Sequence, residues 1–191
     1  MCGIIKSILE DITMDFEKMA LTRQSTRNFS DAEVELEKLQ KICEVSALAP
    51  SACNSQPWKL HIIIKDYPKL DEFRKTLQVV GLNKFLNNVN NYIVVEQVFG
   101  NMSATMGSKM SKNDLNSIDL GILTSYICFE AMQLGLGSCI LGAFRKDKMQ
   151  KAMGFNKKQV VRIVVAIGYP KENDPIRKKV RKPLDKVIEV H

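Results

Sequence analysis

Three short apolar runs in the chain have the composition of buried strands. They cover residues 60–64, 92–95 and 160–167, and β-branched side chains make up most of each run. Runs of this length without polar alternation are typical of strands that are covered on both faces. We therefore expect three buried strands, and we assign a structural role to His61 in the first of them.

Apolar residues at helical spacing separate these runs. Residues 30–33 have the form of a capping box, and the apolar positions after them predict a helix to about Leu48, which Pro50 stops. Helices are also predicted from Pro68 to about residue 80 and over residues 146–153.

The stretch over residues 118–134 is apolar on nearly every side. It predicts a helix that is buried in the core or in a dimer interface, with Ser117 as its N-cap and Gly135 and Gly137 at its end. Strands that alternate with helices indicate a sheet that is covered on both faces.

Two segments stand outside this pattern. Residues 1–16 mix charged with apolar side chains, which predicts an amphipathic helix and not a signal peptide. Residues 99–117 combine Gly, Asn, Ser and Met without a consistent period, so we expect the least ordered interior segment there. It is either a lid over a pocket or a surface excursion, and the sequence leaves both open.

Composition narrows the class of protein. A chain of 191 residues with 45% hydrophobic and 26% charged residues describes one globular domain, over residues 1–191. No apolar run approaches the roughly 20 residues that a membrane span needs. The five cysteines form no Cys-x-x-Cys pair and have no metal-ligand spacing to the two histidines. This usage predicts a reduced, cytoplasmic protein without a metal site.

The net charge of +7 invites comparison with nucleic-acid-binding proteins. Residues 171–186 hold seven basic and three acidic side chains, which accounts for +4 of that total. A basic nucleic-acid-binding domain is therefore one hypothesis. Aromatic residues do not interleave with this basic run, which weighs against it.

Two polar motifs carry the candidate chemistry. In an extended segment the side chains of Arg23, Ser25 and Arg27 share a face and can converge on one anion. Two solvated surface arginines are the alternative interpretation. The loop between Pro50 and Pro57 is rich in hydrogen-bonding side chains, which suits a fixed loop that reads the polar edge of a ring.

These motifs occur in a familiar order. An Arg-x-Ser-x-Arg segment, a helix and then Ala-Pro-Ser-x-x-Asn-Ser-Gln-Pro-Trp resemble the opening of the FMN-dependent nitroreductase family, and the resemblance extends over residues 17–191. The Gly-Leu-Gly-x-x-x-x-Gly segment from Gly135 to Gly142 resembles the segment that lies against the flavin ring in that family. Lys179-Val180-Arg181-Lys182-Pro183 resembles its closing Lys-x-Arg-x-Pro element.

The resemblance implies an α+β fold, a three-layer α/β/α sandwich with a mixed central sheet flanked by helices. It also implies a homodimer with the flavin at the interface. The C-terminal extension, residues 171–191, would contain a strand over residues 180–190 and cross to the partner subunit. The polar loop would serve the partner's flavin.

The resemblance further implies a set of FMN ligands. Backbone N–H groups of Leu141 and Gly142 would approach the ring atoms N5 and O4, since glycine has no Cβ to prevent close contact. A helix cap followed by a core strand is the alternative for this segment. Cys53 in the polar loop is either a modest hydrophobe or a reactive thiol. The implied FMN ligands are Arg23, Gln24, Ser25, Arg27, Ser51, Asn54, Ser55, Gln56, Ile140, Leu141, Gly142, Lys179 and Arg181.

The implied activity is an oxidoreductase with tightly bound FMN. NADH or NADPH would act as a transient reductant, and a nitroaromatic, a quinone or another small acceptor would then take the electrons in a ping-pong mechanism. The flavin N5 would carry the chemistry, so no catalytic side chain is expected. A flavin-binding sensor or storage protein without turnover is the alternative that keeps the same site.

Overall fold

The computed structural model describes residues 16–191, except for the side chain of Val80. The helix expected over residues 1–16 falls outside this part of the chain, apart from Phe16. The described residues group into two compact units. One is Gln24–Asp174, and the other joins residues 16–23 to Pro175–His191.

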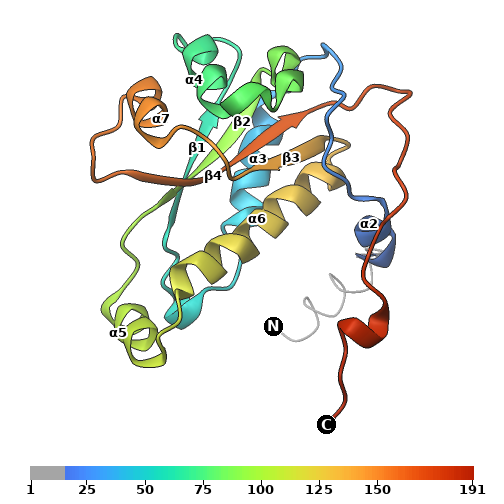
Figure 1. Cartoon of the computed structure of the whole chain (residues 1–191). Helices are drawn as coiled ribbons and strands as arrows, with labels where there is room; N and C mark the ends of the chain where they lie inside the picture. Colours follow the sequence, from blue (N-terminus) through green and yellow to red (C-terminus); the bar gives the residue numbers. More distant parts are fainter. Residues whose placement is uncertain (1–15) are drawn as a thin grey trace, which may run out of the picture. The chain divides into compact units, whose positions relative to one another are not determined.

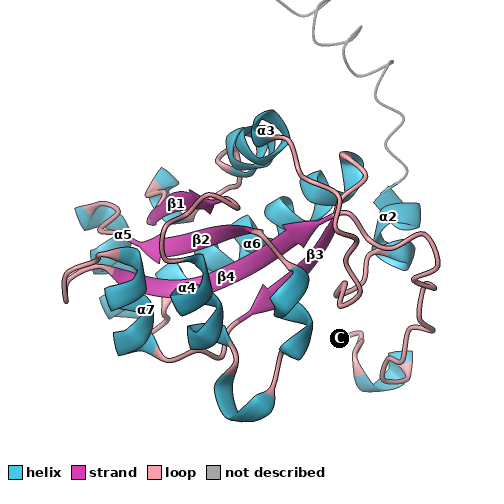
Figure 2. Ribbon diagram, turned by 90° about the horizontal axis from the view of Figure 1, so that it is seen from above, coloured by secondary structure: helices cyan, strands magenta, loops and turns pink. Residues whose placement is uncertain are grey.

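A four-stranded sheet forms the centre of Gln24–Asp174 (Figures 1 and 2). Its order is β1 (Trp58–Ile63), β2 (Asn91–Gln97), β4 (Val160–Gly168) and β3 (Gly137–Leu141), and neighbouring strands are antiparallel. The three predicted strands are confirmed. β3 is the core strand that the sequence offered only as an alternative.

Parallel pairing is confined, among the described residues, to an isolated bridge between Ser25 and Ser138. The sheet is therefore mixed only through this bridge. A β-bulge between Val95 and Glu96 shifts the register of β2 against β4.

Side-chain alternation along β2 builds two core layers, one on each face of the sheet. Tyr92 and Val94 pack with residues of α4 (Leu70–Leu77) and α7 (Lys146–Met153), among them Phe73 and Met149. On the other face, buried side chains of α3 (Leu36–Ser46) and α6 (Leu115–Gln133) meet Ile93 and Val95. Figure 2 shows the two pairs of helices on opposite faces of the sheet. The predicted three-layer α+β sandwich is confirmed.

Several predicted helix boundaries are wrong. α3 begins at Leu36 and not after a capping box at residue 30, because Ser30 donates its N–H to the carbonyl of Tyr169 at 2.8 Å and belongs to an extended segment. The helix ends at Ser46, two residues before the predicted end. α4 begins at Leu70 instead of Pro68.

The N-cap of α6 is Asp114, whose carboxylate accepts the N–H of Ser117 at 3.1 Å, so the predicted cap at Ser117 is wrong. At the other end Gly135 has a φ of +75°, and the N–H of Leu136 reaches the carbonyl of Ala131. This is the Schellman arrangement, which confirms the predicted end of the helix.

Two corrections concern whole segments. Residues 102–111, expected to be irregular, form α5 (Met102–Ser111). The strand predicted over residues 180–190 is wrong. A 3-10 turn at Leu184–Lys186 is the regular structure there, and its hydrogen bonds are local, such as Ile188 N–H to the Leu184 carbonyl at 2.8 Å.

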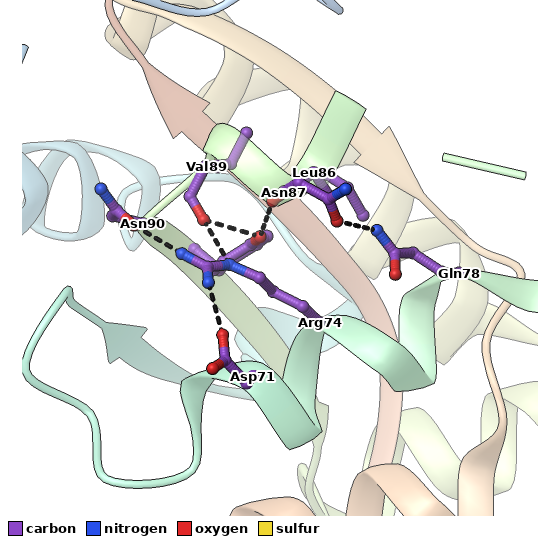
Figure 3. Close-up of polar contacts among 8 residues, drawn as sticks. Asp71, Arg74, Gln78, Leu86, Asn87, Val89 and Asn90 are labelled. Carbon is purple, nitrogen blue, oxygen red and sulfur yellow. Dashed lines mark hydrogen bonds and ion pairs between the residues drawn. The ribbon is translucent and has the colours of Figure 1, made fainter. Parts of the chain in front are cut away.

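The turn that leads into β2 is held by Arg74 of α4 (Figure 3). Its Nε donates to the carbonyl of Val89 at 2.9 Å, and its fork reaches Asp71 and Asn90. The hydroxyl of buried Tyr92 donates to the same Val89 carbonyl at 3.0 Å. Within the described residues, helices fall short of the length and apolar character that a membrane crossing requires.

Candidate functional site

Ser25 and Thr26, from the Arg-x-Ser-x-Arg segment, lie beside β3 at one edge of the sheet. Ser25 pairs with Ser138, and Thr26 donates its N–H to the Ser138 carbonyl at 2.9 Å. The approach is close enough that a Cβ on Gly137 would stand 2.5 Å from Thr26 Oγ1. Gly137 is therefore needed for packing. Arg27 is exposed beside this contact.

The polar loop over residues 51–56 is closed on itself by its own side chains. Ser51 Oγ accepts the N–H of Gln56 at 2.9 Å, and the Gln56 amide donates to Asn54 Oδ1 at 3.1 Å. Cys53, Asn54 and Gln56 have φ values of 50°, 50° and 45°. Left-handed backbone costs non-glycine residues of order 1 kcal/mol each, so this conformation needs support from elsewhere.

That support comes from two side chains outside the loop. Asp119 of α6 is 3% exposed, and both of its carboxylate oxygens lie within hydrogen-bond distance of the Ala52 N–H, at 3.1 and 3.2 Å. The Ser55 hydroxyl donates to the same carboxylate at 3.5 Å. Asn101, just before α5, donates from Nδ2 to the Cys53 carbonyl at 3.0 Å.

The end of β3 presents a different surface. Ile140 is 43% exposed, whereas Leu141 is buried. A Cβ on Gly142 would meet no described atom within 4 Å, and Gly142 does not have a positive φ. Contacts within the described chain therefore do not require glycine at this position, and the open space fits the approach of another group.

Lys179 and Arg23 meet in the unit that joins residues 16–23 to Pro175–His191. Lys179 Nζ donates to the Arg23 carbonyl. Partial burial, followed by the charges of Arg23, Arg181 and Arg177, lowers the pKa of Lys179. One guanidinium nitrogen of Arg23, Nη1, is buried without a hydrogen-bond partner. A donor in this state, among cations that repel one another, fits an anion such as a phosphate.

The predicted residues of Gln24–Asp174 do not form one cluster. The loop over residues 51–56 leads into β1, at one edge of the sheet, and Ile140–Gly142 ends β3 at the other edge. Three strand spacings, roughly 14 Å, separate these edges. Within Gln24–Asp174 the predicted residues thus form two separate surfaces, a polar loop and the end of β3 with its exposed Ile140.

Sequence reasoning missed Asp119 and Asn101. Asp119 is the one charged residue between positions 115 and 129, in a stretch that is otherwise apolar. A buried carboxylate needs hydrogen-bond donors, and this requirement was the available signal. Asn101 offered no comparable signal, since Asn is common in loops and at helix caps.

A cavity of about 580 Å³ lies elsewhere, against α4 and α7. None of its lining residues belongs to the predicted site. They are Glu72, Lys75, Thr76, Gln78, Arg145, Lys148 and Lys151.

The antiparallel sheet with a helix pair on each face makes the protein a three-layer α+β sandwich. Two family models match the chain: "Nitroreductase family" over residues 20–80 and "Putative TM nitroreductase" over residues 69–191. A protein of Archaeoglobus fulgidus, called "Putative NADH dehydrogenase/NAD(P)H nitroreductase", is 34% identical over 161 residues, which are 81% of this chain and 85% of the relative.

Solved structures agree. An FMN-dependent nitroreductase from Clostridium difficile is 28% identical, with a TM-score of 0.68 over 90% of this chain and 96% of the other. A nitroreductase family protein from Streptococcus pneumoniae, 19% identical, has a TM-score of 0.77 over 93% and 100% of the two chains, which shows the fold. The chain belongs to the nitroreductase family and is an oxidoreductase.

Proposed function

We propose that the protein is an FMN-dependent oxidoreductase that takes electrons from NADH or NADPH and passes them to a nitroaromatic, a quinone or another small acceptor. The donor and the acceptor bind in turn, in a ping-pong sequence. The similarity to relatives called NADH dehydrogenase or NAD(P)H nitroreductase supports the donor, and the similarity to an FMN-dependent nitroreductase supports the cofactor.

The observation that carries the proposal is the buried, unpartnered Nη1 of Arg23 beside Lys179. We assign the FMN phosphate to Arg23, Lys179 and Arg181 on this ground. Ser25 and Arg27 join them on the sequence pattern alone, together with Gln24. Two guanidinium forks and an ammonium can neutralise a phosphate dianion, and each charge-assisted hydrogen bond strengthens its retention.

We assign the ring to the two separate surfaces of Gln24–Asp174, the polar loop over residues 51–56 and the end of β3. Ser51, Asn54, Ser55 and Gln56 supply amide and hydroxyl groups that recognise the polar edge of the ring. Backbone at Leu141 and Gly142, beside the exposed Ile140, offers N–H donors where close approach is sterically possible. When bound, the flavin supplies the hydride and electron transfer chemistry, so the chain contributes binding, orientation and electrostatics.

Separation of the two surfaces supports a homodimer. The loop over residues 51–56 and the end of β3 lie at opposite edges of one sheet, so a single ring would meet one surface from each subunit. We place the flavin at that interface and let the segment 171–191 cross to the partner. The cysteine usage, five residues without paired spacing, supports a cytoplasmic setting.

An absorbance spectrum tests the proposal. The protein is supplemented with FMN, desalted, and then mixed without oxygen with NADH and, separately, with NADPH. We expect retained peaks near ~370 and ~450 nm, typical of oxidised flavin, that bleach with at least one nucleotide. Retained peaks that do not bleach would favour the alternative hypothesis, a flavin-binding protein without turnover. A spectrum without retained flavin would refute the proposed FMN site.

A pair of variants tests the phosphate assignment. Arg23→Gln removes the charge while it keeps a polar side chain, and we expect FMN affinity to fall about tenfold or more because a charge-assisted contact is lost. Lys171→Gln is the matched control, since Lys171 is an exposed cation of Gln24–Asp174 with no assigned role. Fluorescence titration of FMN gives both affinities, and equal losses in the two variants would contradict the assignment.

A further inference from the structure

The loop over residues 51–56 cannot hold its conformation by itself. Cys53 and Gln56 have left-handed backbone without being glycine. The side-chain hydrogen bonds within the loop join exposed polar groups, and its backbone bonds from the N–H groups of Asn54 and Ser55 form a single 3-10 turn. Water competes for such bonds, so they are weak constraints. Contacts with the rest of the fold must therefore select this conformation.

We propose that Asp119 and Asn101 are positioning residues, which hold the loop in the conformation that reads the flavin ring. The inference rests on the proposed function for the ligand, but the two contacts are properties of the chain alone. Neither residue is itself assigned to touch the flavin.

Asp119 is the stronger of the two anchors. Its carboxylate is buried in the second turn of α6, a helix that packs along the sheet, and it accepts from Ala52 N–H at the start of the loop and from the Ser55 hydroxyl near its end. A carboxylate accepts these bonds more strongly than an amide or hydroxyl would, because the acceptor is charged. Its burial keeps water from replacing it.

Asn101 holds the middle of the loop and has a second role. Its Nδ2 donates to the Cys53 carbonyl at 3.0 Å, while its Oδ1 accepts the N–H of Ala104 at 2.9 Å and so caps α5. The neighbouring Gly100 packs against Ser55, where a Cβ would come within 2.8 Å of the Ser55 Cβ. The start of α5 and the loop are therefore one packed unit.

The two roles of Asn101 can be separated by substitution. Asn101→Asp keeps an oxygen that caps α5 but replaces the donor to the Cys53 carbonyl with a second acceptor. For Asp119 the near-isosteric variant is Asp119→Asn. Asp114→Asn is its matched control, since Asp114 caps the same helix and its carboxylate accepts hydrogen bonds from Ser117.

Hydrogen exchange of the backbone amides in the cofactor-free protein is the first measurement, because the Ala52 N–H donates a hydrogen bond to the Asp119 carboxylate. We expect Asp119→Asn and Asn101→Asp each to speed exchange over residues 52–56 by about tenfold, with α5 still protected in Asn101→Asp. FMN affinity, measured by fluorescence titration, should fall by about tenfold in both variants while Asp114→Asn changes neither quantity.

Exchange and FMN affinity that match Asp114→Asn in both variants would overturn the inference. If Asp119→Asn fails to fold, Asn101→Asp, whose side chain is half-buried at the start of α5, decides the question alone. Wild-type protein that binds no FMN would refute the proposed function and the flavin-reading role of the loop. Unchanged exchange in the variants would instead refute the anchoring, so the two failures are distinguishable.

Discussion

The glycines at positions 137 and 142 have different surroundings. At Gly137 the side chain of buried Thr26 occupies the place of a Cβ. At Gly142 no described atom lies within 4 Å of that place. Sequence reasoning assigned the helix end to Gly135 and Gly137 together and the flavin contact to Gly142. The helix end belongs to Gly135, and the role of Gly142 remains a proposal.

Alanine at these two glycines gives a matched pair. Gly137→Ala should lower the free energy of unfolding by about 1–3 kcal/mol, because the added methyl overlaps Thr26 in a packed core. Gly142→Ala should change stability by less than about 0.5 kcal/mol yet weaken FMN binding, because it obstructs only an approaching ligand. Denaturant unfolding and FMN titration separate the two effects. Equal FMN affinity in Gly142→Ala and wild type would contradict the proposed ring contact.

Cys43 makes stability depend on alkaline pH. Burial raises the pKa of its thiol from 9.0 to about 11, since desolvation disfavours the thiolate. The unfolded chain therefore releases this proton first. The contribution is fully present below pH 9 and is lost as the pH rises from 9 to about 11.

We expect the free energy of unfolding to fall across that window, by about 1.4 kcal/mol per pH unit at most from this group. Cys43→Ala should flatten the decline, whereas Cys53→Ala, at an exposed position, should leave it unchanged. Urea unfolding at a series of pH values measures both slopes. An identical decline in wild type and Cys43→Ala would assign the effect to other groups.

Among the elements, the strands were the most predictable and the boundaries of helices the least. The continuous apolar runs at β2 and β4 predict strands that are covered by helices on both faces, and the structure shows such strands. The start of α3 was not predictable from local pattern, because the backbone of Ser30 bonds to Tyr169, which is 139 residues away in sequence. β3 was ambiguous because Gly135 and Gly137, just before and at the start of the strand, fit a helix end, while the same segment resembles one that lies against a flavin ring.

The site was predictable to a lesser extent. The order of the motifs along the chain located the polar loop and the cations, because that order can be read from the sequence without knowledge of the fold. The anchors Asp119 and Asn101 act across 67 and 48 residues, and a single sequence does not reveal such pairings. Left-handed backbone at Cys53 was equally hidden, because Cys does not favour it as glycine or Asn does.

Arg74 provides a test of how α4 holds the turn before β2 (Figure 3). Arg74→Met keeps much of the apolar stem but removes the fork to Asp71, Val89 and Asn90, so we expect a loss of about 1–3 kcal/mol in the free energy of unfolding. Arg74→Lys should lie between, because one ammonium cannot reproduce a planar fork. Lys75→Met, at an exposed position on the same helix, is the control, expected within about 0.5 kcal/mol.

Thermal or urea unfolding compares the three variants. A loss in Arg74→Met no larger than that in Lys75→Met would show that Tyr92, which donates to the same carbonyl, suffices to hold the turn.

For the whole molecule, charge is concentrated at one end of the sequence. Residues 175–191 carry six basic and two acidic side chains, +4 of the net +7. A phosphate bound by these cations is attracted through a field that salt screens. The same charge made nucleic-acid binding a hypothesis.

We expect FMN affinity to fall several-fold between about 50 mM and about 500 mM salt, with riboflavin, which lacks the phosphate, much less affected. Titrations of both ligands at each salt concentration measure the difference. Equal salt dependence for FMN and riboflavin would show that the cations do not hold the phosphate. Tight, salt-dependent binding of DNA in place of FMN would favour the nucleic-acid hypothesis.

Asn101 has a consequence for redesign. Because one side chain both starts α5 and fixes the Cys53 carbonyl, a new segment spliced over residues 102–111 would also disturb the loop unless position 101 were preserved. A library of variants of this chain should therefore vary the exposed methionines Met102, Met106 and Met110 and leave Gly100 and Asn101 unchanged.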